Sequence, residues 1–406
     1  MTVEQFREKF PILGMKDAKG NPLVYLDNAA TSQRPLEVVQ AQQQAALEYN
    51  ANIHRAVHSL SSKATDAYEA SRDAAKSFLN AAFREEIIFT SGDTAAINLA
   101  ARSFGEAFIR EGDEIIIGEA EHHSNIVPWQ QTAARQKARV VALRCEDDGS
   151  YSLERLKGLI TEKTRIVCLA HASNVLGIVN DIRVVADICH AAGVPILVDG
   201  AQGAAHCPVD VQALGCDFYT FSAHKIYGPT GVGVLYGRKE LLEQMPPFMS
   251  GGEMVGTVTL EKTTFAPLPM KFEAGTQNFN SVAALKPALE FARRTMEDEH
   301  LGESLEDTAQ WLQDALMRIE GLRLYGTKGQ KLPVFSFTIE GVHHEDLSLL
   351  LDKMGVAVRS GQMCAEPLMN RFGVSGMLRA SLLPYNTREE AEYFVKALLR
   401  AVKMLK

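Results

Sequence analysis

Short apolar runs rich in β-branched residues recur along the chain between residues 87 and 236. Most of them are continuously apolar and do not alternate with polar positions, which is typical of strands that are buried on both faces. The pattern predicts strands over residues 87–90, 114–117, 139–143, 165–169, 195–198, 218–221 and 232–236.

Helical patterns lie between most of these runs. Residues 94–109 repeat apolar side chains at helical spacing, and residues 152–160 and 180–192 do the same. Strands that alternate with helices predict an open, mainly parallel sheet with helices on both faces. The gap between residues 221 and 232 is too short for a helical crossover, so the last two strands are expected to be antiparallel.

The pattern changes after residue 247. Residues 248–277 are rich in Gly and Pro with little periodicity, which predicts a long loop of the kind that usually has a function. Beyond it, a smaller α/β domain is predicted, with helices over residues 281–296, 305–320, 344–354 and 387–405 and strands over residues 335–339 and 357–359. We therefore expect residues 1–25 to be a segment that packs on the small domain, residues 26–290 to form a large domain, and residues 291–406 to form the small domain.

Length and charge narrow the class of protein. A chain of 406 residues is long enough for two cores, and a net charge of −8 gives no support to nucleic-acid binding. The first ten residues alternate charges with single apolar positions, unlike a secretory signal, and no run approaches the roughly 20 apolar residues of a membrane span. We expect a cytoplasmic protein that binds neither nucleic acid nor membrane.

The six cysteines form no C-x-x-C pair. Five of them lie mostly in apolar runs and are expected to be reduced, buried thiols, whereas Cys364 follows a Gly-containing turn and is considered separately below. The adjacent histidines His122 and His123 have no acidic or cysteine cluster to complete a zinc site, so no metal is predicted.

A lysine follows the predicted strand 218–221, in the segment Ser222-Ala223-His224-Lys225 before a Gly/Pro turn. Lysine is seldom buried without a function, and burial would make its amine a nucleophile able to form a Schiff base with an aldehyde. A surface lysine in a turn explains this segment equally well when it is considered alone.

An aspartate, Asp199, ends the predicted strand 195–198, where the carboxyl ends of parallel strands form a ligand crevice. A helix N-cap would explain Asp199 alone, but it would not explain the pair that Asp199 forms with Lys225, 225 − 199 = 26 residues later. Pyridoxal 5′-phosphate (PLP) needs an acid against its ring nitrogen and a lysine for its aldehyde. The two residues together predict a PLP site.

Other strand ends carry groups that the same cofactor needs. Thr94 lies in a run of small and hydroxyl residues that opens a helix, which is a typical phosphate site, and Ser222 and His224 are further phosphate candidates. His122 is predicted to stack on the cofactor ring, and Asn174 offers an amide to the same crevice.

These segments resemble the class V aminotransferase group of fold-type I PLP enzymes. Within that group the chain looks like the group II, SufS-type cysteine desulfurases and selenocysteine lyases. The matching blocks lie at residues 25–31, 121–123, 198–202, 222–225, 359–361, 364–365 and 379–381.

The resemblance implies a fold-type I architecture, with a seven-stranded, mainly parallel sheet between helices, and a role for each matching residue. Lys225 would be the Schiff-base lysine, Asp199 would pair with the pyridinium, His122 would stack on the ring, Gln202 would face the ring hydroxyl, and Thr94, Ser222 and His224 would hold the phosphate. Thr276 would reach the phosphate of the neighbouring subunit in a homodimer.

The resemblance also implies that Cys364 accepts sulfur. As a thiolate it would attack the γ-sulfur of cofactor-bound L-cysteine and become a persulfide, leaving alanine. Arg379 is expected to bind the substrate carboxylate with Arg359 assisting, although surface ion pairs would also explain these arginines. A sulfur-acceptor protein of the Suf system would then collect the sulfur for iron–sulfur cluster assembly.

Gln362 and Met363 stand where group II members often carry two histidines, so no imidazole from these positions can tune the thiol of Cys364. A selenocysteine lyase, or a kynureninase-like or transaminase-like enzyme, would share Lys225 and Asp199 without requiring Cys364. A non-enzymatic sulfur carrier or regulatory protein on the same fold is the remaining alternative.

Overall fold

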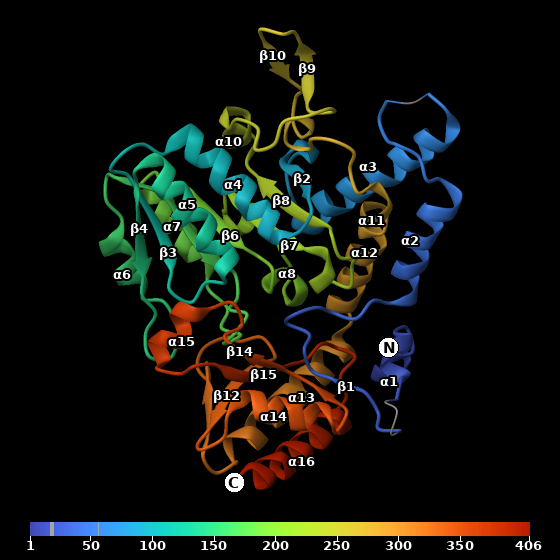
Figure 1. Ribbon diagram of the computed structural model, residues 1–406, viewed down its shortest axis with the longest axis vertical. Helices are drawn as coiled ribbons and strands as arrows, with labels where there is room; N and C mark the ends of the chain where they lie inside the picture. The colour runs from blue at the N-terminus through green and yellow to red at the C-terminus, as the bar shows by residue number, and fades with distance from the viewer. Residues whose placement is uncertain (17–19, 56) are drawn as a thin grey trace.

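The computed structural model describes residues 1–16, 20–55 and 57–406. Its largest element is a seven-stranded sheet with the order β2-β8-β7-β6-β5-β3-β4 (Figure 1). The strands are β2 (Ile87–Thr90), β3 (Glu114–Gly118), β4 (Arg139–Leu143), β5 (Thr164–Ala170), β6 (Ile196–Asp199), β7 (Phe218–Ser222) and β8 (Gly233–Gly237). All seven strands predicted from the sequence are present.

The direction of the strands in this sheet also follows the prediction. β3 to β7 pair in parallel, whereas β8 is antiparallel to both of its neighbours, β7 and β2. The short link between β7 and β8 leaves no room for a helical crossover, so the chain reverses and Ser222 pairs with Gly233. The sheet therefore has the seven strands and the mainly parallel arrangement that were predicted.

The apolar runs of the sheet are continuous because both faces of the sheet are buried. Ile116 points into one core with α3 (Ser59–Leu79) and α7 (Ile182–Ala191). Its neighbours Ile115 and Ile117 point into the other core, with α4 (Asp93–Phe108) and α5 (Val127–Gln136).

A second, antiparallel sheet follows, with the order β11-β12-β15-β14. Its core also contains side chains from three helices, among them Leu312, Leu351 and Phe394. The elements of this part are α13 (Glu299–Met317), β11 (Leu322–Tyr325), β12 (Val334–Ile339), α14 (His344–Asp352), β14 (Arg359–Gly361), α15 (Glu366–Phe372), β15 (Met377–Ser381) and α16 (Arg388–Leu405). The limits of the domains expected from the sequence stay a prediction.

Two predictions for these later elements were wrong. The single strand expected over residues 357–359 is two strands, because β13 (Val356–Ala357) pairs with β1 (Val24–Tyr25) while β14 pairs with β15. The helix expected over residues 281–296 is divided at Ala284 into α11 (Phe279–Ala283) and α12 (Leu285–Met296). The sequence pattern also missed β11 and β15.

Residues 248–277 are only partly a loop. They contain a hairpin of β9 (Val255–Val258) and β10 (Thr263–Phe265), which projects from the top of the molecule in Figure 1. Nearly all of its side chains are exposed, so no alternation between a buried and a solvated face marks it in the sequence.

The N-terminal segment contacts both parts of the molecule. The ring of Phe10 lies 4.8 Å from that of Tyr385 and 5.9 Å from that of Tyr227. No helix in the described ranges is long and apolar enough to cross a membrane.

The remaining helices are α1 (Val3–Arg7), α2 (Leu36–Glu48), α6 (Leu153–Leu159), α8 (Gly203–His206), α9 (Val211–Leu214) and α10 (Lys239–Gln244).

Candidate active site

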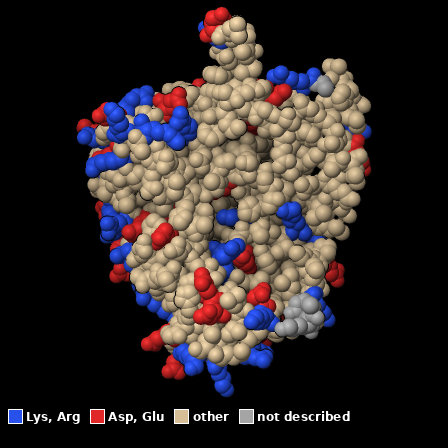
Figure 2. Space-filling model, viewed as in Figure 1, with Lys and Arg blue, Asp and Glu red and all other residues tan. Residues whose placement is uncertain are grey.

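A cavity of about 300 Å³ lies where the carboxyl ends of β5, β6 and β7 meet the N-terminus of α4 and residues of the second sheet. In Figure 2, basic and acidic side chains lie close together near the middle of the face shown. The polar and sulfur-containing residues that line the cavity are Asp93, Thr94, His122, Ser124, Asn174, Asp199, Gln202, Ser222, His224, Lys225, Arg359, Met363, Cys364 and Arg379.

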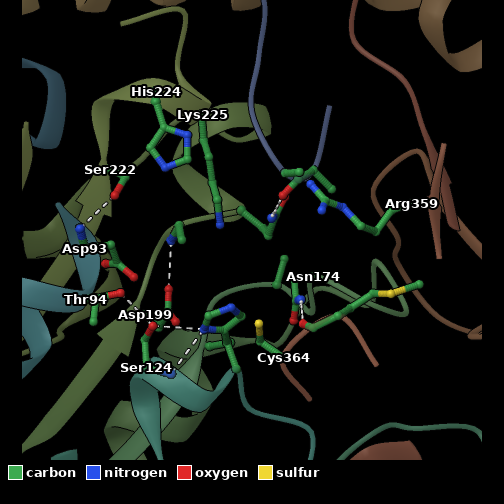
Figure 3. A pocket seen from close by; sticks show the side chains of 18 of the residues that line it. Asp93, Thr94, Ser124, Asn174, Asp199, Ser222, His224, Lys225, Arg359 and Cys364 are labelled. Carbon is green, nitrogen blue, oxygen red and sulfur yellow. Dashed lines mark hydrogen bonds between the residues drawn. The ribbon is translucent and has the colours of Figure 1, made fainter. Parts of the chain in front are cut away.

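Lys225 enters the cavity from a short 3-10 helix, Ala223–Lys225, directly after β7. The turn is fixed by the amide of Gly228, which donates to the carbonyl of Ala223 at 2.9 Å. Figure 3 shows the lysine side chain extended into the cavity. Burial lowers the pKa of the Lys225 amine, and the carboxylates of Asp199 and Asp93 act in the opposite direction. A lowered pKa increases the share of neutral amine, which is the nucleophilic form.

Asp199 ends β6 and is 5 % exposed. One of its carboxylate oxygens accepts a hydrogen bond from the amide of Ala201 at 2.9 Å. Burial raises the pKa of Asp199, while Lys225 acts in the opposite direction. A buried carboxyl of this kind is suited to a cationic ring nitrogen, whose charge would favour the ionised form.

The part of the cavity around Asp93, Thr94, Ser124 and Ser222 has the donors of an anion site. α4 begins there, and the amide of Asp93 donates to the hydroxyl of Ser222 at 2.7 Å. The hydroxyls of Thr94 and Ser124 are 2.8 Å apart. Burial lowers the pKa of His224 to about 4, so its ring is neutral near pH 7. Hydroxyls, a neutral imidazole and a helix N-terminus together suit a phosphate group.

His122 precedes a 3-10 helix, His123–Asn125, that follows β3. Its Nδ1 accepts the amide of Ser124 at 3.1 Å and lies 2.9 Å from the hydroxyl of the same residue. Burial lowers the pKa of His122 to about 4. A neutral ring held in this way is suited to stacking on a flat ligand.

Cys364 lies in a turn that contains two consecutive non-glycine residues with positive φ. The φ angle is 51° for Met363 and 55° for Cys364. The turn is held from outside by two hydrogen bonds. Asn174 Nδ2 donates to the carbonyl of Met363 at 2.8 Å, and the amide of His123 donates to the carbonyl of Cys364 at 2.7 Å. The sulfur points into the cavity in Figure 3.

Cys364 is the exposed thiol among the six cysteines, all of which are free. Four of the others are buried as expected, whereas Cys207 is half-buried, so the prediction of five buried thiols was wrong at that position. Met363 is buried in a small apolar cluster and Gln362 is exposed, so neither side chain brings a titrating group to the thiol.

Arg379 lies on β15 and is 3 % exposed. Its Nη1 donates to the carbonyl of Asn174 at 2.8 Å, and its Nη2 donates to Asp27 at 3.1 Å. Its buried Nε has no hydrogen-bond partner among the described residues. Arg359 is half-exposed and pairs with Asp27 at 2.9 Å. Arg379 therefore keeps a donor for an anion in the cavity.

The structure brings together every predicted site residue except Thr276, which is exposed and does not line the cavity. The sequence reasoning missed Asp93, Ser124 and Asp27. Asp93 and Ser124 are direct neighbours of residues that were singled out, so their place in the chain could have revealed them. Asp27 could not be found in this way, because its partner Arg379 is 352 residues away. No group of three metal-ligating side chains occurs in the described ranges.

A lysine and an aspartate at the ends of neighbouring strands, in a sheet of this topology, define the class of fold-type I PLP-dependent enzymes. Residues 24–394 match the model of the aminotransferase class-V family, and the chain belongs to this family, whose members are in general PLP enzymes.

Relatives that match over nearly the full length of the chain are named as cysteine desulfurases. The chain is 45 % identical over 398 residues to a probable cysteine desulfurase of Halalkalibacterium halodurans, covering 98 % of this chain and 97 % of the relative. It is 45 % identical over 405 residues to a cysteine desulfurase of Klebsiella pneumoniae, covering 100 % and 99 %.

Two solved structures with a similar fold are also those of cysteine desulfurases. The crystal structure of the cysteine desulfurase CsdA (S-sulfonic acid) from Escherichia coli matches with a TM-score of 0.91 and 40 % identity, covering 100 % of both chains. The apo structure of a cysteine desulfurase from Thermococcus onnurineus matches with a TM-score of 0.92 and 34 % identity, covering 100 % of this chain and 99 % of that one.

Proposed function

We propose that this protein is a PLP-dependent cysteine desulfurase that converts L-cysteine to L-alanine and takes the sulfur onto Cys364 as a persulfide. The observation that carries the proposal is that one cavity is lined by the amine of Lys225 and the thiol of Cys364. Full-length similarity to cysteine desulfurases supports it.

The residues of the cavity fit PLP. Lys225 would hold its aldehyde, Asp199 its ring nitrogen and His122 its ring face, while Gln202 would face the ring hydroxyl. Thr94, Ser222 and His224 would hold its phosphate, and Asn174 would contact both cofactor and substrate. The cofactor supplies an electron sink for the negative charge that develops at the substrate Cα.

The protein's own groups carry the remaining chemistry. Arg379, assisted by Arg359, binds the substrate carboxylate, since a guanidinium can donate two parallel hydrogen bonds to it. Lys225, as a neutral amine, removes the proton from Cα and later delivers a proton to the product. Asp199 stabilises the positive charge of the ring nitrogen throughout.

Cys364 receives the sulfur. Its thiolate attacks the sulfur atom of the substrate, a sulfur–sulfur bond forms, and the bond between Cβ and sulfur breaks. The electron pair of the broken bond stays with the carbon skeleton, which takes up a proton and leaves as alanine. L-cysteine and the thiol thus yield L-alanine and a persulfide, with no external oxidant or reductant.

We further propose a cytoplasmic homodimer in which Thr276 reaches the phosphate site of the neighbouring subunit. The exposure of Thr276, outside the cavity of its own chain, supports this role. A sulfur-acceptor protein of the Suf system would collect the persulfide sulfur for iron–sulfur cluster assembly.

The test measures visible absorption of the purified protein and alanine released from L-cysteine. Lys225→Ala should lose both the absorption and the activity, whereas Cys364→Ala should keep the absorption and lose alanine release. Cys207→Ala is the matched control, because this thiol does not line the cavity, and it should keep both. Wild-type alanine release by Cys364→Ala would refute the assignment of the sulfur acceptor, and release of a keto acid in place of alanine would indicate a transaminase.

A further inference from the structure

A second buried carboxyl group lines the cavity and has no role in the chemistry above. Asp93 is 7 % exposed and occupies the first position of α4. Its Oδ1 is buried and has no hydrogen-bond partner among the described residues. Figure 3 shows its carboxyl group between Ser222 and Thr94, in the part of the cavity that has the donors of an anion site.

An ionised Asp93 would be incompatible with a phosphate group in this part of the cavity. The amide of Asp93 donates to Ser222 and the start of α4 attracts anions, but a carboxylate among these donors would repel a phosphate dianion. A carboxylic acid at the same place could instead donate a hydrogen bond to a phosphate oxygen. We propose that Asp93 works as a neutral acid that donates a hydrogen bond to the phosphate of the ligand, so that binding depends on the proton it holds.

The surroundings of Asp93 favour the protonated form. Burial and the nearby carboxylate of Asp199 raise the pKa of Asp93 to about 8, while Thr220 and Lys225 act in the opposite direction. The positive end of α4 also favours the ionised form. Burial and Asp199 outweigh these effects, and Asp93 is therefore mainly neutral at pH 7.

The two histidines that face Asp93 do not titrate in the same range, and Lys225 can be removed. Asp199, whose pKa is also raised by burial, faces Asp93 as well, and it is kept in every variant so that its titration is common to all of them. His122 and His224 have pKa values lowered to about 4, so both stay neutral from about pH 7 upwards. A phosphate ester has its second pKa near about 6 and is a dianion over the same range. Lys225 is removed by working in a Lys225→Ala background, which also prevents the covalent link to the cofactor.

This inference rests on the proposed function only in taking the ligand to carry a phosphate group. The test measures the dissociation constant of PLP for the full-length Lys225→Ala protein across about pH 7 to about pH 9.5. Above the pKa of Asp93, the constant should rise about tenfold for each pH unit, because each bound ligand requires one proton on the protein. The same background with Asp93→Asn should show a slope lower by about one proton, since its amide is a donor at every pH.

Asp93→Thr is a second variant, which keeps a neutral donor if the amide does not fit, and it should behave like Asp93→Asn. Equal slopes with and without Asp93 would overturn the proposal.

Infrared difference spectra between the wild-type chain without cofactor and Asp93→Asn provide a readout that needs no ligand. At pH 7 they should contain the carbonyl band of a protonated carboxyl, and carboxylate bands alone would also overturn the proposal. Failure of every variant to bind PLP would refute the proposed cofactor. The infrared spectra would still show whether the carboxyl group of Asp93 is protonated.

Discussion

At the scale of single residues, burial decides the protonation state of several titrating groups in the cavity. The pKa values of His122 and His224 are lowered to about 4, and that of Asp93 is raised to about 8. These three groups are therefore mainly neutral near pH 7, so the polar wall of the cavity carries less charge than its composition suggests. Arg379 is a buried cation there, with a donor to spare.

Replacing Arg379 with Ala should raise the KM for L-cysteine by about 10- to 100-fold, because a hydrogen bond to a charged group contributes about 1.5–3 kcal/mol. Steady-state kinetics check this, with visible absorption as evidence that the cofactor site is intact. Arg359→Ala should have a smaller effect, since this side chain is half-exposed. An unchanged KM for Arg379→Ala would refute its role as the carboxylate clamp.

Glu121 is a buried acid outside the cavity lining, 1 % exposed, that accepts a hydrogen bond from Asn125 Nδ2 at 2.8 Å. Burial raises its pKa to about 8. The folded protein therefore holds a proton that the unfolded chain loses above about pH 4.5, and this group's contribution to stability falls as pH rises from there to about 8.

Comparison of the wild type with Glu121→Gln isolates this effect. From about pH 5 to about pH 8, the free energy of unfolding of the wild type should fall relative to the variant by up to about 1.4 kcal/mol per pH unit. Urea denaturation at several pH values measures it. A difference that stays constant with pH would mean that Glu121 is ionised in the folded protein.

At the scale of elements, a buried ion pair connects α3 to the segment that precedes Thr276. Arg72 donates to both carboxylate oxygens of Glu273, at 2.7 and 2.9 Å. Glu273 also accepts the amide of Phe89 and the hydroxyl of Tyr68, both at 2.8 Å. These bonds satisfy the carboxylate and fix the start of the segment.

Glu273→Leu should lower the free energy of unfolding by about 3–5 kcal/mol, because it leaves the guanidinium of Arg72 buried without its main partner. Urea denaturation checks this. Asp187→Ala is the matched control, since it breaks an exposed pair with Arg183, and it should cost about 1 kcal/mol or less. Equal costs for the two variants would contradict the importance of the buried pair.

Elements could be predicted from the sequence where burial leaves a periodic pattern. Six strands of the large sheet were predicted because both of their faces are buried and their runs are mostly continuously apolar. The edge strand β4 was predicted from its β-branched run, although only Leu143 in it is buried. β15 was missed because Arg379 stands in its middle, and the partner that allows its burial, Asp27, is distant in the sequence. The hairpin of β9 and β10 was missed because it has almost no buried face.

At the scale of the whole molecule, the candidate site was largely predictable because strand ends in a parallel sheet meet at one edge. That rule brought Lys225, Asp199 and Thr94 together from sequence alone. Thr276 is different, because it is exposed and does not line the cavity of its own chain. Its proposed role needs a second subunit. The test must therefore combine two chains.

Mixed dimers of Lys225→Ala and Thr276→Ala test whether Thr276 acts across subunits. In such a dimer one site would lack both residues, whereas the other would hold Lys225 of one chain and Thr276 of its partner. Half of the sites should then regain wild-type PLP affinity, measured by absorption after tagged purification of the mixed species. Affinity no better than that of Thr276→Ala alone would show that Thr276 acts within its own chain.

The central claim is that sulfur passes from L-cysteine to Cys364. Mass spectrometry of peptides from the cofactor-loaded protein, incubated with L-cysteine without reductant and then alkylated, tests it most directly. The account predicts one extra sulfur atom on the peptide with Cys364, and none on it in Lys225→Ala. Alanine formation with no extra sulfur on Cys364, or with the sulfur on another cysteine, would contradict it.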